Sequence, residues 1–169
     1  MAVHIKLTNR TSSEDPPPYL LPKQAEEDVI IAAALEILDK RVKKECLLAS
    51  PQAVRQWLAV RAAGLECEVF TVVLLDASHS LIKADDMFRG TLTQTSVYPR
   101  EVVKLALKEN AAAVILVHNH PSGNPQPSRA DEYLTQTMKA ALALVDVRVL
   151  DHIITAGGET CSMAEKGLM

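Results

Sequence analysis

Residues 111–131, AAAVILVHNHPSGNPQPSRAD, contain a strand signal, a loop signal and a helix signal in immediate succession. The apolar run that ends at Val117 is typical of a central strand that is buried on both faces. Residues 121–127 hold three prolines and a glycine, which are incompatible with a helix. Ser128 then begins a helical pattern that extends to about Leu144. The stretch therefore predicts a buried strand, a tight loop and a helix that returns beside the end of the strand.

The rest of the chain alternates between the same two kinds of pattern. Apolar residues at helical spacing, with proline at a first helical position and glycine or asparagine at an end, predict helices. Runs of β-branched and aromatic residues bounded by turn residues predict strands. The predicted helices are residues 26–43, 51–64, 99–109 and 128–144, and the predicted strands are residues 66–76, 79–90, 111–120, 146–155 and 159–163. Strands that alternate with helices indicate a layered α/β domain, with a mixed β-sheet flanked by helices.

The length of 169 residues predicts a single domain with one hydrophobic core. Residues 1–24 are polar and include three consecutive prolines, so we expect them to form a flexible N-terminal tail. Residues 25–169 are expected to form the domain, with a helical lead-in at 25–64 and a core at 65–169.

The composition of the sequence argues against several classes of protein. The formal net charge of -3 gives no basic surface of the kind that nonspecific nucleic-acid binding requires. The three cysteines, Cys46, Cys67 and Cys161, are far apart and odd in number, which argues against a disulfide framework and against a cysteine zinc site. The sequence has no apolar run long enough for a membrane span or a signal peptide. We therefore expect a soluble cytoplasmic protein.

His118 and His120 lie at the end of the predicted strand 111–120. Because residues two apart in a strand share a face, the two rings should point the same way and Asn119 the opposite way. Two imidazoles placed in this way can bind one metal ion, and catalytic zinc typically takes three protein ligands and one water. Asp131, in the first turn of the following helix, is the candidate third ligand. The sequence thus predicts a zinc site made of His118, His120 and Asp131.

Other interpretations of these residues remain open from the sequence. Ser128 and Asp131 form an S-x-x-D pattern, in which the serine caps the helix and the acid lies at the positive end of the helix dipole. Ser128 is also spaced to lie at the edge of the site, where its hydroxyl can donate to a developing oxyanion. The letters His118-Asn119-His120 do not indicate an HNH nuclease, because those enzymes scatter the named residues along a ββα unit. They do not indicate a zinc deaminase either, because this sequence lacks the P-C-x-x-C pair that those enzymes need.

The pattern H-x-H, seven residues, S, two residues, D resembles the metal-binding signature of the JAMM (MPN+) metalloproteases. With YPREVVKLALKENAAAVIL (98–116), LVDVRVLDHIIT (144–155) and SMAEKGLM (162–169), the chain is similar to the RadC family in particular. The likeness runs from about Leu65 to Met169. Full-length RadC proteins carry a helix-hairpin-helix region ahead of this domain, and no matching glycine-rich hairpins occur here, so the chain looks most like the short YeeS-like RadC homologues.

The resemblance implies a JAMM fold and a mechanism. A zinc ion activates a water molecule, and a glutamate on an early strand takes the proton from that water. Glu68 in LECEVF fits the family position best, and Glu66 is the alternative if the register slips, because both are expected on one strand face. Ser128 would help to polarise the substrate carbonyl. The implied function is zinc-dependent hydrolysis of a peptide or isopeptide bond.

Two other functions remain open. The RadC name carries an association with DNA repair, so the site could act on or near nucleic acid, although the acidic balance argues against this. A third interpretation is a binding module that keeps zinc without catalysis. His152, in the predicted strand 146–155, is expected to make a hydrogen bond near the core, or to contact the site from outside the ligand set.

Overall fold

A computed structural model describes residues 23–44, 51–62, 65–90 and 97–169 of the chain. The predicted tail 1–24 lies outside these residues except for Lys23 and Gln24, which begin the first helix. The helices are α1 (Lys23–Lys44), α2 (Pro51–Ala62), α3 (Pro99–Lys108) and α4 (Arg129–Ala143). The strands are β1 (Val69–Leu75), β2 (Leu81–Arg89), β3 (Ala113–Asn119), β4 (Arg148–Ala156) and β5 (Glu159–Ser162).

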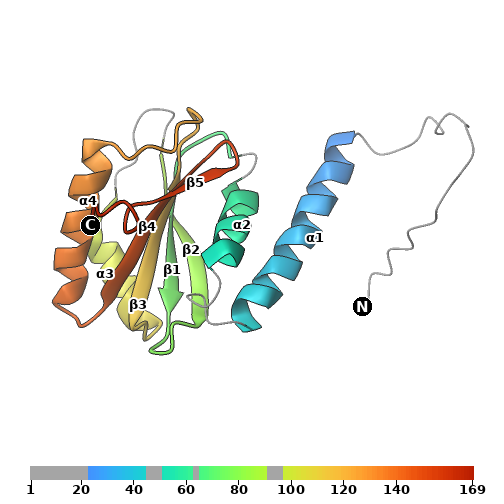
Figure 1. Ribbon diagram of the computed structural model, residues 1–169. Coiled ribbons are helices and arrows are strands. Elements are labelled where there is room, and N and C mark those ends of the chain that lie inside the picture. The colour runs from blue at the N-terminus through green and yellow to red at the C-terminus, as the bar shows by residue number, and fades with distance from the viewer. Residues whose placement is uncertain (1–22, 45–50, 63–64, 91–96) are drawn as a thin grey trace, which may run out of the picture.

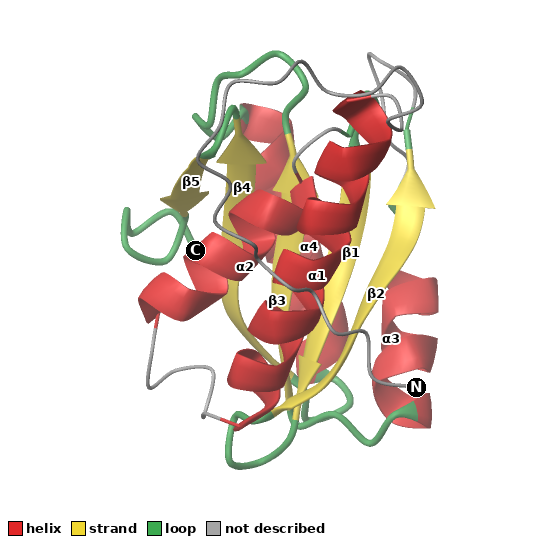
Figure 2. Ribbon diagram, turned by 90° about the vertical axis from the view of Figure 1, so that its right-hand side faces the viewer, coloured by secondary structure: helices red, strands yellow, loops and turns green. Residues whose placement is uncertain are grey.

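The strands form one mixed sheet in the order β2-β1-β3-β4-β5. β1 pairs antiparallel with both β2 and β3, β4 runs parallel to β3, and β5 pairs antiparallel with β4. The sheet lies between two helical layers, with α3 and α4 on one face and α2 and α1 on the other (Figure 1). Turned by 90°, the molecule shows α1 and α2 in front of the strands, with α3 and α4 behind them (Figure 2). The predicted α/β class and mixed sheet are confirmed.

β3 is the middle strand, and its alternating side chains divide the core into two clusters. Ile115 and Val117 pack with Trp57 and Leu58 of α2. The residues that alternate with them face α3 and α4. This second cluster contains Phe70, Val72, Leu74, Val102, Ala106, Ala111, Val114, Leu116, Met138, Leu142 and Val147. Burial of both faces explains why β3 is an unbroken apolar run until its last residues.

Local signals account for the helix ends around β3. Pro99 stands at the start of α3, where its missing N–H costs no hydrogen bond. Asn110 has the predicted left-handed backbone, with φ 51°, and ends that helix. The sequence placed the first strand at residues 66–76, but β1 begins only at Val69 because the chain bends at Cys67. None of the described helices is both long and apolar enough to cross a membrane.

We expect Leu116→Ala to lower the free energy of unfolding by about 2–5 kcal/mol, because Leu116 is fully buried in the centre of β3 and its truncation leaves a cavity. Chemical denaturation followed by circular dichroism measures the loss. Leu107→Ala is the matched control, since Leu107 is 53% exposed on α3 and its truncation should change the stability by less than about 0.5 kcal/mol. Equal losses in the two variants would contradict the assigned core.

Candidate metal centre

Three polar side chains stand at the end of β3: His118 and Asn119 are its last two residues and point to opposite faces, and His120 follows them. His118 stacks against Phe70, on the face that carries α4. Asn119 points to the other face, where it lines the same cleft as Leu58 and Arg61 of α2. His120 follows β3 directly and shares the face of His118, because their Nε2 atoms lie 2.9 Å apart. The predicted sharing of one face by the two histidines is therefore correct.

α4 brings a carboxylate to the same place. Ser128 caps the helix, and its hydroxyl accepts a hydrogen bond from the backbone N–H of Asp131 at 3.2 Å. In return, Oδ2 of Asp131 accepts the backbone N–H and the hydroxyl of Ser128, both at 2.7 Å. The capping box that the sequence indicated is therefore present. It holds the Asp131 side chain so that its other oxygen, Oδ1, faces the histidines.

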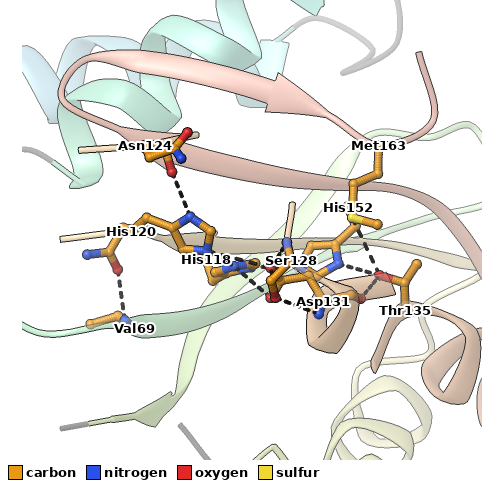
Figure 3. Close-up of polar contacts among 10 residues, drawn as sticks. Val69, His118, His120, Asn124, Ser128, Asp131, Thr135, His152 and Met163 are labelled. Atoms are coloured by element: carbon orange, nitrogen blue, oxygen red, sulfur yellow. Dashed lines mark hydrogen bonds and ion pairs between the residues drawn. The ribbon is translucent and has the colours of Figure 1, made fainter. Parts of the chain in front are cut away.

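His118, His120 and Asp131 form a compact cluster (Figure 3). One ligand atom from each residue lies within 4.8 Å of the others. Oδ1 of Asp131 is 3.2 Å from Nε2 of His118, and Oδ2 is 3.7 Å from Nε2 of His120. His118 is 1% exposed, whereas His120 is half-buried and opens the cluster to solvent.

A main-chain contact fixes the ring of His120. Its Nδ1 lies 2.8 Å from the carbonyl oxygen of Asn124, which can only accept a hydrogen bond. The proton of a neutral His120 therefore sits on Nδ1, and Nε2 presents a lone pair to the cluster. The loop reaches this position through Gly123, whose φ of +80° favours glycine and whose N–H donates to the carbonyl of His120.

The charges of the cluster are also set by its surroundings. Burial opposes ionisation of Asp131, but hydrogen bonds from His118 and Ser128 outweigh it and hold the pKa of the carboxyl group well below its usual range. Burial lowers the pKa of the neighbouring His152 to about 3, and the His118 ring adds to this shift. Asp131 is thus a carboxylate at neutral pH, and His152 is an uncharged imidazole.

The donor set fits a divalent cation. Two imidazole nitrogens and a carboxylate oxygen are typical zinc ligands, and three protein ligands leave a fourth position open. Nε2 of His120 carries a lone pair toward Nε2 of His118 only 2.9 Å away, so either a proton of His118 or a metal ion must lie between the two nitrogens. These residues can therefore hold a metal ion without rearrangement of the loop.

Glu66 and Glu68 lie before β1 rather than within it, which corrects their predicted place on the strand. The bend at Cys67 removes the simple two-residue alternation that made the two glutamates equivalent. Phe70 pairs with His118 in the antiparallel ladder, and continuing this register by two residues places Glu68 opposite His120. Glu68 is half-buried and Glu66 is exposed, and the assignment of Glu68 as the base stays a prediction.

Asn119 fixes the main chain on both sides of Glu68. Its side-chain oxygen accepts the N–H of Val69 at 2.8 Å, and its amide donates to the carbonyl of Cys67 at 2.9 Å. The carbonyl of Glu68 itself accepts the N–H of Gly90 at 2.8 Å. The sequence analysis did not assign this role to Asn119, although the alternation of side chains had already placed it on the opposite face from the histidines.

Ser128 lies at the edge of the cluster, as predicted, but its single hydroxyl proton is directed at Asp131. Donation to a substrate oxygen would require this hydroxyl to rotate. Its role toward a substrate therefore stays a prediction.

The comparisons with known proteins agree with this geometry. The family model described as the RadC-like JAB domain matches residues 48–168. A UPF0758 protein of Acidovorax sp. (strain JS42) is 57% identical over 147 residues, which cover 87% of this chain and 62% of that protein. A UPF0758 protein of Aromatoleum aromaticum is 56% identical over 150 residues, covering 88% of this chain and 67% of that protein. The chain thus spans about two-thirds of the length of these relatives, and it belongs to the family of proteins with a RadC-like JAB domain.

Proposed function

We propose that this protein is a zinc-dependent hydrolase that cleaves peptide or isopeptide bonds. The observation that supports this function best is the convergence of His118, His120 and Asp131 at one solvent-open point, with ligand atoms within 4.8 Å of one another. A bound zinc ion would supply Lewis acidity, which polarises a carbonyl oxygen and makes a water molecule acidic near neutral pH. The family match supports the proposal, since the JAMM resemblance rests on the same residues.

Glu68 is the proposed general base. A base must lie within hydrogen-bond reach of the attacking water. Continuing the β1/β3 pairing by two residues beyond Phe70 and His118 would set Glu68 opposite His120, which supports this role. The carboxylate would take a proton from the water as the water attacks the carbonyl carbon. It would then return the proton to the leaving nitrogen as the C–N bond breaks. Ser128 would donate its hydroxyl to the carbonyl oxygen after release from Asp131.

A cleft of about 330 Å³ beside His120 offers a path for the substrate. Its lining includes Ala62, Gly123, Gly157 and Gly158, whose small size leaves room for a polypeptide backbone. Among the described residues that line the cleft, His120 is the only one with an ionisable side chain. An extended, uncharged peptide segment therefore suits this cleft better than a phosphate backbone does.

The metal ligands can be tested by calorimetric titration with Zn²⁺. We expect the wild-type protein to bind one ion per chain, and Asp131→Asn to lower the affinity by at least ~10²-fold, because a ligand should matter at least as much as its supporting partners. Glu132→Gln is the matched control, since it removes the adjacent acid of the same helical turn. Wild-type affinity in Asp131→Asn would reject the proposed ligand set.

The base can be tested with a library of peptides and isopeptide-linked lysines. Glu68→Gln should retain zinc and lower kcat by about 10²–10⁴-fold, because only the proton acceptor is lost. Glu66→Gln should leave kcat unchanged, since Glu66 is exposed on the other side of the Cys67 bend. Full turnover in the Glu68→Gln protein would remove Glu68 from the mechanism, and a loss confined to Glu66→Gln would exchange the two roles.

A further inference from the structure

We propose that His152 and Thr135 are positioning residues that fix the tautomer of His118. They form a buried relay of hydrogen bonds that begins at the main-chain carbonyl of Asp131 and ends at the His118 ring (Figure 3). The relay joins β3, β4 and α4, and it links two of the proposed ligands to each other. The expected gain in metal affinity rests on the function proposed above, whereas the hydrogen bonds of the relay are already present in the metal-free protein.

The direction of the relay follows from the hydroxyl of Thr135. Its Oγ1 lies 2.6 Å from the carbonyl oxygen of Asp131 and 2.6 Å from Nδ1 of His152. The hydroxyl has one proton, and a carbonyl can only accept, so the proton is donated to Asp131. The sulfur of Met163 is a weaker acceptor at 3.6 Å. Thr135 must then accept from His152, which carries its proton on Nδ1.

The same argument passes through His152 to His118. His152 is fully buried, which keeps its ring neutral, so its Nε2 has a lone pair and no proton. Nε2 lies 2.9 Å from Nδ1 of His118, and His118 must therefore donate to it. His118 thus keeps its Nδ1 proton for His152, and its Nε2, which faces Asp131 and His120, donates to Asp131 only until a metal ion replaces that proton. That nitrogen is the atom that a metal ion would bind.

The relay is closed to water. The ring of Phe70 stacks on His118 and meets His152 edge-on, with centroids 6.4 and 5.8 Å away. Thr135 and Met163 are both 0% exposed. Since no solvent molecule can replace a missing partner here, each hydrogen-bond donor depends on the single acceptor that the fold provides.

Removal of the Thr135 hydroxyl should reverse the direction in which the hydrogen bonds of the relay are donated. Nδ1–H of His152 would lose its acceptor inside the core, which favours the tautomer with the proton on Nε2. His152 would then donate to Nδ1 of His118, and the proton of His118 would move to Nε2. Metal binding would have to undo both changes, so its free energy would be reduced.

The experiment compares Thr135→Val with Thr135→Ser. Nitrogen-15 NMR of the metal-free protein, at a pH at which the rings are neutral, reports which nitrogen of His118 carries the proton, and calorimetry with Zn²⁺ reports the affinity. We expect Nδ1–H in the wild type and in Thr135→Ser. In Thr135→Val we expect a shift toward Nε2–H and an affinity about 10–100-fold lower.

Thr137→Val is the matched control for the helix. Thr137 makes the same kind of bond to a carbonyl four residues earlier, that of Tyr133, at 2.9 Å, but it lies outside the relay. This variant should keep the wild-type tautomer and affinity. A folded Thr135→Val protein with Nδ1–H on His118 and wild-type affinity would overturn the relay. Failure of the wild type to bind zinc would instead reject the proposed function, and the tautomer in the metal-free protein would still decide the inference.

A second pair of variants decides the question if Thr135→Val does not fold. The amide of His152→Gln can accept from His118 and donate to Thr135, whereas His152→Leu can do neither. We expect the glutamine variant to keep the His118 tautomer and most of the zinc affinity, and the leucine variant to lose both. Equal affinities and the same tautomer in the two variants would overturn the inference.

Discussion

The alternation of side chains along β3 is the constraint on which the rest of the site depends. Because neighbouring residues of a strand point to opposite faces, His118 and Asn119 serve different functions although they are adjacent in the chain. His118 faces α4 and contacts the buried His152, whereas Asn119 faces the other way and holds the main chain around Glu68. A slip of one residue would exchange the faces, and the buried apolar run of β3 makes such a slip costly.

The start of α4 serves two purposes with one side chain. Sequence reasoning left helix capping and metal ligation by Asp131 as alternatives, but its two carboxylate oxygens allow both. Oδ2 accepts two hydrogen bonds from Ser128, and Oδ1 faces His118. The cap thus orients the carboxylate before any metal arrives, which reduces the conformational freedom that binding has to remove. The same interaction explains why the Ser128 hydroxyl is not free to face a substrate.

The site is closed to water on one side and open to solvent on the other. Toward α4 and β4, the histidines rest on a buried relay with defined donors and acceptors. Toward α2 and the β4–β5 turn, His120 borders a cleft of small residues. A rigid support on one side and access on the other is the arrangement that the proposed metal-dependent hydrolase would require, since ligands must be held while the substrate enters and leaves.

The sequence by itself determined the α/β class, the buried strand, the capped helix and the residues of the proposed ligand set, because these depend on local periodicity, turn residues and spacing. It did not determine the start of β1, since the bend at Cys67 is set by contacts with Asn119, a residue about fifty positions away. It also gave only a general role to His152 and none to Thr135. These two residues are far apart in the chain and gain their function only when the parallel pairing of β3 with β4, and the packing of α4, bring them beside His118. Tertiary structure decided these contacts because the partners come from segments that are distant in the chain, and no local pattern specifies which segments will meet.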